Sequence, residues 1–157
     1  SLSIRRGWHK VKIKAQERTP EAFVKQSNSL MGIDSDLQVF HIRGFMISIK
    51  APLITYKDEK EKEEILQFIK AVKSFDNNFF DAVASLNLSA SKDFVFTTNE
   101  SVIVYWGEFN IKNLNEKITD FKKVFANAKS RNDKIEYINM TLYDLGRVIV
   151  KAKKNKV

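Results

Sequence analysis

Few residues in this sequence have the type and spacing that catalysis or metal binding requires. The histidines, His9 and His41, lack a second ligand type at metal spacing, and the chain has no cysteine. Asp34 and Asp36 flank Ser35, and a turn explains this carboxylate pair, because short side chains bond to the backbone there. No serine sits in a nucleophile elbow, and the five glycines stand singly, so no phosphate-binding loop is predicted. We therefore expect no enzymatic activity, no metal and no cofactor.

The charge pattern suggests a different chemistry, the binding of anions. The formal net charge is +8, and basic residues near the start of the chain surround Trp8; they are Arg5, Arg6, Lys10, Lys12 and Lys14. Such clusters can bind phosphates. However, the lysines alternate along an expected strand, where solubility alone would place them, and the run at 151–156 is typical of a solvated tail. Binding to protein is the preferred interpretation. A basic module that binds nucleic acid or an anionic surface is the alternative.

Two helices are predicted to position the remaining elements. Residues 58–75 begin with Asp58 and Glu61 in a capping-box pattern, and the apolar stripe that follows has helical spacing. Residues 113–130 begin with Asn113 and Glu116 as start signals. The predicted buried stripe of this second helix is Leu114, Ile118, Phe121, Phe125 and Ala128. A shorter helix is also predicted over 76–83.

Short strands fill the intervals between these helices. The alternation of apolar and polar residues predicts strands over 22–25, 30–33 and 37–42, followed by an apolar, β-branched run at 45–49 that Pro52 ends. A three-strand meander is predicted over 85–89, 93–97 and 102–106. The order of strands, helix, strands, helix and strands predicts an α+β fold, a mostly antiparallel sheet with two main helices packed on one face.

The last stretch, 134–153, is predicted to form two short strands joined at 143–146. Asp144 and Gly146 supply the turn chemistry. In the final strand Val148, Val150 and Ala152 alternate with residues that include Lys151. Because few residues follow this strand, we expect its outer edge to be unpaired and its lysines to discourage indiscriminate pairing. A guarded edge of this kind can also be a docking site.

The beginning of the chain is predicted to belong to a different unit. A strand with one solvated face covers 11–15, and Pro20 breaks the pattern after Thr19. We place a domain junction there, with 1–19 and 20–157 as the two parts. The chain starts with Ser, and it shows no signal peptide and no apolar run of about 20 residues. We therefore expect a piece of a longer protein.

Several stretches occur together in a familiar order. They are 4–6 and 11–14 before Glu-Arg-Thr-Pro-Glu-Ala at 17–22, then 32–40, Pro-Leu-Ile at 52–54, Val-Tyr-Trp-Gly at 104–107, 116–118, Tyr-Ile-Asn-Met-Thr at 137–141 and 146–150. This order resembles the extracytoplasmic part of the bacterial cell division proteins of the FtsQ/DivIB family, across essentially the whole chain. There are departures. Leu37 stands where a turn glycine is usual, Asn139 and Thr141 replace Asp and Arg, and Lys151 stands about where one family member has a tryptophan. Two extra residues lie between Gly107 and Lys117.

The resemblance implies a membrane-anchored, non-enzymatic division scaffold. Its parent would have one transmembrane helix, a POTRA domain, of which 1–19 would be the remnant of the last strand, and the β domain of 20–157. This region would lie on the extracytoplasmic side of the cell membrane at the division septum. The expected partners are FtsB- and FtsL-like proteins, with FtsB adding a strand to the last strand. The residues implied in this docking are Tyr137, Arg147, Val148, Ile149, Val150 and Lys151.

Overall fold

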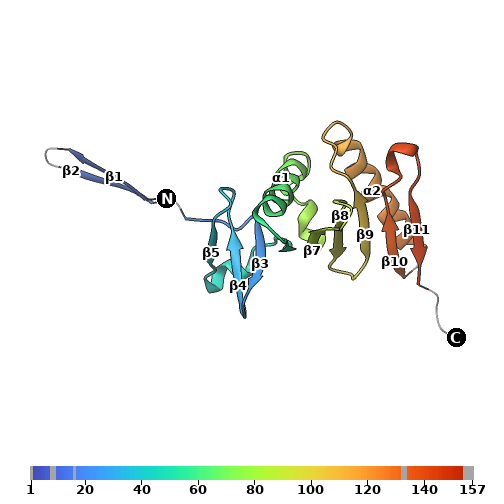
Figure 1. The fold of residues 1–157 in the computed structure, drawn as a ribbon, viewed down its shortest axis with the longest axis horizontal. Coiled ribbons are helices and arrows are strands. Elements are labelled where there is room, and N and C mark those ends of the chain that lie inside the picture. Colours follow the sequence, from blue (N-terminus) through green and yellow to red (C-terminus); the bar gives the residue numbers. More distant parts are fainter. Residues whose placement is uncertain (1, 8–9, 16, 132–133, 154–157) are drawn as a thin grey trace.

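The computed structural model describes the backbone of residues 2–7, 10–15, 17–131 and 134–153, and side chains from residue 17 onward except Phe45 and Ile47. His9, Trp8, the side chains of the first basic cluster and residues 154–156 lie outside this description. The described residues form two sheets. Strands β1 (Leu2–Gly7) and β2 (Lys10–Ala15) form an antiparallel hairpin that projects from the rest of the chain (Figure 1). The sequence predicted β2 but not β1.

The second sheet has nine strands in the order β11-β10-β9-β8-β7-β6-β3-β4-β5. The bounds are β3 (Ala22–Gln26), β4 (Ser29–Ile33), β5 (Val39–His41), β6 (Leu53–Thr55), β7 (Val83–Leu88), β8 (Phe94–Thr98), β9 (Ile103–Gly107), β10 (Ile135–Asn139) and β11 (Ile149–Ala152). Five of the eight pairings are antiparallel, and three are parallel. The predicted mostly antiparallel α+β fold is therefore present.

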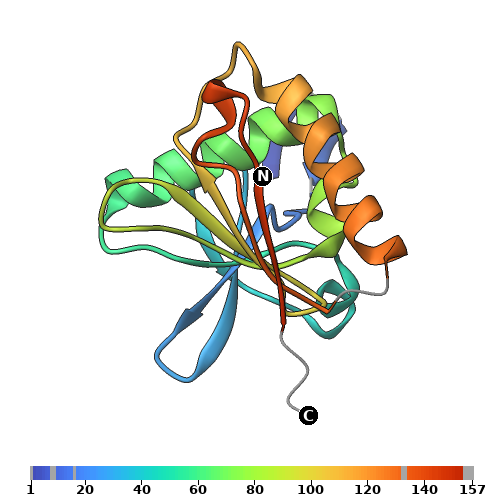
Figure 2. The same cartoon turned by 90° about the vertical axis from the view of Figure 1, so that its right-hand side faces the viewer.

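Helices α1 (Glu59–Phe75) and α2 (Leu114–Ser130) cover the same side of this sheet (Figure 2). On that side, one row of directly paired side chains crosses six neighbouring strands. The row consists of Val24, Ile54, Leu86, Phe96, Val104 and Ile138, all of them buried. The buried stripes of both helices pack onto this row and form one core with it. In α2 the predicted stripe is buried, except that Phe125 is only half-buried.

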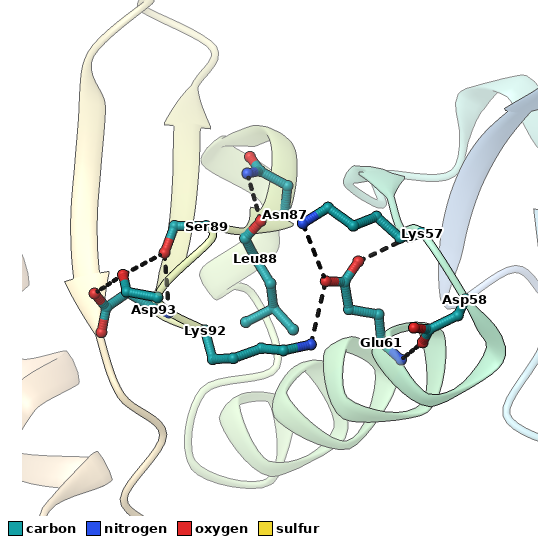
Figure 3. Close-up of polar contacts among 9 residues, drawn as sticks. Lys57, Asp58, Glu61, Asn87, Leu88, Ser89, Lys92 and Asp93 are labelled. Carbon is teal, nitrogen blue, oxygen red and sulfur yellow. Dashed lines mark hydrogen bonds and ion pairs between the residues drawn. The ribbon is translucent and has the colours of Figure 1, made fainter.

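The first turn of α1 has the predicted cap. Asp58 Oδ1 accepts a hydrogen bond from the Glu61 backbone N–H at 2.8 Å, and Glu61 Oε2 accepts one from the Lys57 N–H at 2.8 Å. The Glu61 side chain is also 3.3 Å from Lys92 Nζ in the turn between β7 and β8 (Figure 3). The Lys57 N–H donor is the largest cause that lowers the pKa of Glu61, and the Lys92 ammonium adds to it. This buried carboxylate therefore joins the helix start to the neighbouring turn.

Three short segments differ from the prediction. The apolar run at 45–49 lies largely in a 3-10 helix, η1 (Gly44–Ser48), because periodicity alone does not separate a short buried helical turn from a strand. Strand β6 was not predicted, since Pro52 was interpreted as an end. Pro52 instead precedes β6, where a missing N–H costs little, and its carbonyl accepts a hydrogen bond from Phe23 N–H at 2.9 Å. The shorter helix at 76–83 is reduced to a 3-10 turn, η2 (Phe79–Ala82).

The turn at Asp34 is confirmed. Its Oδ1 accepts hydrogen bonds from the N–H groups of Asp36 at 3.0 Å and Gln38 at 2.9 Å, so this carboxylate has a structural role.

No helix among the described residues is long and apolar enough to cross a membrane.

Candidate docking edge at the last strand

Strand β11 forms one end of the nine-stranded sheet (Figure 1). It pairs with β10 on one side, and no strand of the described chain pairs with its other side. The predicted first strand of the hairpin is shorter than expected. Asn139 Oδ1 accepts hydrogen bonds from both the N–H and the hydroxyl of Thr141, at 2.9 and 2.7 Å, and this local turn ends β10 before Met140. The unpaired outer edge that was predicted for the last strand is present at β11 in the described chain.

Two backbone hydrogen bonds fix which groups of β11 face outward. Met140 N–H donates to the Tyr105 carbonyl in β9 at 2.8 Å, so the alternate residue Asn139 directs its backbone groups toward β11. At the other end, Lys153 N–H donates to the Lys134 carbonyl, which makes Lys153 an inward residue. Since direction alternates along a strand, Ile149 and Lys151 also face β10. The N–H and C=O groups of Val150 and Ala152 are therefore the ones left for a further strand.

Three of the predicted docking residues lie together on the face of the sheet opposite the helices. Ile149 is 46% exposed, and Lys151 is paired directly with Tyr137. Lys151 Nζ lies 3.1 Å from Glu136 and 5.5 Å from the centre of the Tyr137 ring. Tyr105 is 5.7 Å from Tyr137, measured between ring centroids, in an edge-to-face arrangement.

The other three predicted residues are placed differently. Val150 continues the core row beyond Ile138, with which it is paired, but it is 40% exposed, since no further strand of the described chain lies beside it. Val148 is half-buried against the core. Arg147 precedes the strand, and its N–H donates to the Leu142 carbonyl at 3.2 Å, so this backbone donor is already used.

Side-chain contacts that the sequence did not predict hold the connection before β11. Tyr143 donates from its hydroxyl to Asp120 Oδ2 at 2.9 Å, and Asn113 Nδ2 donates to Asp144. Burial, with the Asp120 carboxylate, raises the pKa of Tyr143 to about 12. These pairs join α2 to the 3-10 turn η3 (Tyr143–Leu145). Asn113 and Asp144 are far apart in sequence, so no local pattern could have joined them.

Lys117 of α2 contacts the same connection. It is 5% exposed, and its Nζ lies 5.1 Å from the Trp106 ring and 5.6 Å from the Tyr143 ring. Burial lowers the pKa of Lys117, while the Asp144 and Asp93 carboxylates oppose this effect. A cation held between aromatic faces is stabilised by the ring quadrupoles. The segment that leads into β11 is therefore held by several α2 side chains.

Comparison with known proteins identifies the family. Residues 22–141, well over half of the chain, match the family model described as cell division protein FtsQ/DivIB, C-terminal. Among curated proteins, none matches the chain. One similar solved structure is the major extracytoplasmic domain of the trans isomer of the bacterial cell division protein DivIB from Geobacillus stearothermophilus. The identity is 15% and the TM-score 0.48, with 75% of this chain and 98% of that chain covered. On the family match, this chain belongs to the FtsQ/DivIB family, and its role is in cell division.

Proposed function

We propose that the chain is a non-enzymatic scaffold of the cell division machinery and that β11 receives a strand from an FtsB-like partner. Together with an FtsL-like protein, this complex would link early and late division proteins at the septum. The parent protein would be anchored in the cell membrane by an upstream helix, with this region on the extracytoplasmic side and 1–19 as the end of a POTRA domain.

One observation carries this proposal. The sheet ends at β11 with the outward N–H and C=O groups of Val150 and Ala152 unpaired within the described chain. In strand addition, backbone hydrogen bonds of this kind give affinity, and alternate side chains give specificity. Ile149 and Tyr137 supply contact surface on the open face beside this edge.

The direction of the backbone groups gives a sharp test. In Val150→Pro, the ring deletes an outward donor that makes no bond within the sheet, and proline is tolerated on an edge strand in that orientation. We expect this variant to fold and to bind the purified extracytoplasmic segment of the FtsB-like protein from the same genome at least tenfold more weakly. Circular dichroism would check the fold, and calorimetry would measure the binding.

Two matched variants complete the design. Val150→Thr keeps the N–H and the side-chain shape, so it should bind nearly as well as the wild type does. Ile149→Pro deletes an inward donor, so it should loosen the β10–β11 hairpin itself. If Val150→Pro folds and binds the partner with wild-type affinity, docking at this edge is wrong. Binding should also change little with salt, since counterion release governs phosphate binding and not strand addition.

A further inference from the structure

A groove runs along the helix side of β11, where the core layer continues past the last strand. At one end it is lined by Ala128, Arg131, Val150 and Ala152 and has a volume of about 390 Å³. At the other it is lined by Glu116, Asp144 and Val148, with about 590 Å³. Lys123 and Val124 line both parts, so the two hollows adjoin along α2, and together they are called the groove here.

The floor of this groove is apolar. Val150 extends the core row beyond Ile138, and Val124 and Val148 are half-buried side chains packed against the core from α2 and from the residue just before β11. In β11, the residues whose N–H and C=O groups point outward are also the residues whose side chains lie on the helix side of the sheet, because both directions alternate with period two. An added strand would therefore place every second side chain in the groove, beneath α2.

The two ends of the groove carry opposite charges. Arg131 lies at the end near Ala152, and within the described part of the chain it has no ion pair. Glu116 lies at the end near Gly146, also without an ion pair among described residues, and Asp144 is beside it. In the middle, Lys123 lies 3.1 Å from Asp120, which largely neutralises both charges.

The length of the groove sets the spacing of the complementary charges. Glu116 and Arg131 are 15 positions apart along α2 and its C-cap, from 131 − 116, which corresponds to roughly 22 Å at about 1.5 Å per residue. A strand rises about 3.3 Å per residue and covers this length in about six or seven residues. Side chains on one face recur every second residue, so two end charges on the groove side lie about six positions apart.

We propose that the groove selects a bipolar strand, with small apolar side chains facing α2 between one acidic and one basic residue about six positions apart. The acidic residue lies beside Arg131 and the basic residue beside Glu116. This inference rests on the proposed strand docking and adds which strand is accepted and where its ends lie.

Three acetylated and amidated heptapeptides test the charge pattern. Each has Val at its third and fifth positions and Thr at the second, fourth and sixth. The first and last residues are Glu and Lys in one peptide, Glu and Glu in the second, and Lys and Lys in the third. Binding at low salt, followed by NMR titration of the β11 amides, should favour the Glu/Lys peptide by about threefold to fivefold, the upper part of the range for an exposed ion pair. The Glu/Lys peptide can add to β11 in either direction, and in one of them its Glu lies beside Arg131 and its Lys beside Glu116. The design therefore does not depend on the orientation of the added strand.

Protein variants invert the preference. Arg131→Glu should bind the Lys/Lys peptide best, and Glu116→Lys should bind the Glu/Glu peptide best. Both side chains are exposed, so the fold should be kept. Lys70→Glu, which matches the charge change of Arg131→Glu but lies on exposed α1 surface outside the groove, should leave the order unchanged. Equal binding of the three peptides, or no binding of any, overturns the bipolar groove. Docking of the FtsB-like partner is judged separately, by Val150→Pro.

Discussion

At the scale of single residues, the buried carboxylate of Glu61 determines how the start of α1 responds to pH. Its pKa in the folded state is lowered, chiefly by the Lys57 N–H donor. A lowered folded-state pKa means that the unfolded chain binds the proton more readily. The stabilisation is therefore fully present above the ordinary glutamate pKa of about 4.3 and is lost as the pH falls through the lowered value.

We predict that Glu61→Gln destabilises the protein at pH 7 by about 1.5–3 kcal/mol, the range for hydrogen bonds to a charged group. The difference from the wild type should shrink below about pH 4, where the wild-type carboxylate becomes protonated. Urea denaturation at several pH values measures both effects. Glu63→Gln, at an exposed position on the same helix, should change little. A pH-independent difference would contradict the assignment of the effect to the charge.

Residue types predicted several local features of this fold and failed at others. Asp58 and Glu61 form the predicted cap, since both partners lie within one turn. Asn113 occupies the N-cap position of α2, but its side chain makes no cap and bonds to Asp144 instead. Leu37 takes the left-handed conformation, with φ of 65°, at the position where the family resemblance places a glycine. The sequence marked this departure but could not give its conformation.

At the scale of elements, the amphipathic pattern of α2 predicted its buried face. Phe121 is 7% exposed and packs edge-on against Phe96 and near Trp106 and Phe79. We predict that Phe121→Ala costs about 3–5 kcal/mol, because it leaves a cavity in this aromatic cluster. Phe125→Ala should cost clearly less, since Phe125 is only half-buried. Chemical denaturation of both variants measures the difference, and equal losses would show that the helix face is wrongly assigned.

Elements with strong periodicity were predicted, and those decided by distant contacts were not. In both long helices the apolar spacing repeats over several turns, and in the β7–β9 meander the apolar and polar residues alternate several times. Strand β6 has three residues, and it exists because it pairs in parallel with both β3 and β7. The open edge was predicted because few residues follow the last strand, but which backbone groups of β11 face outward depends on the bond from Met140 to Tyr105. Tyr105 was missed, although its exposed position in an alternating strand was a usable signal.

At the scale of the whole molecule, the two sheets are separate. Among the described strands, β1 and β2 pair only with each other, and the core residues whose side chains are described run from Ala22 onward. The link to the larger sheet includes Arg18, whose Nη1 lies 3.0 Å from Asp34 Oδ2, and Arg18 follows the hairpin. The hairpin is therefore expected to contribute little to the stability of the nine-stranded sheet.

We predict that deletion of residues 1–16 changes the thermal midpoint by less than about 2 °C, because the core, the caps and the Arg18–Asp34 ion pair all remain. A change of 1 kcal/mol would shift the midpoint by roughly 2–4 °C in a domain of about 150 residues, so the measurement is sensitive enough. Differential scanning calorimetry of both chains is the direct comparison. Arg18→Ala in the shortened chain serves as the matched perturbation: it removes the ion pair and should lower the midpoint further. A large drop, or loss of cooperative unfolding, on deletion alone would mean that the hairpin supports the main sheet.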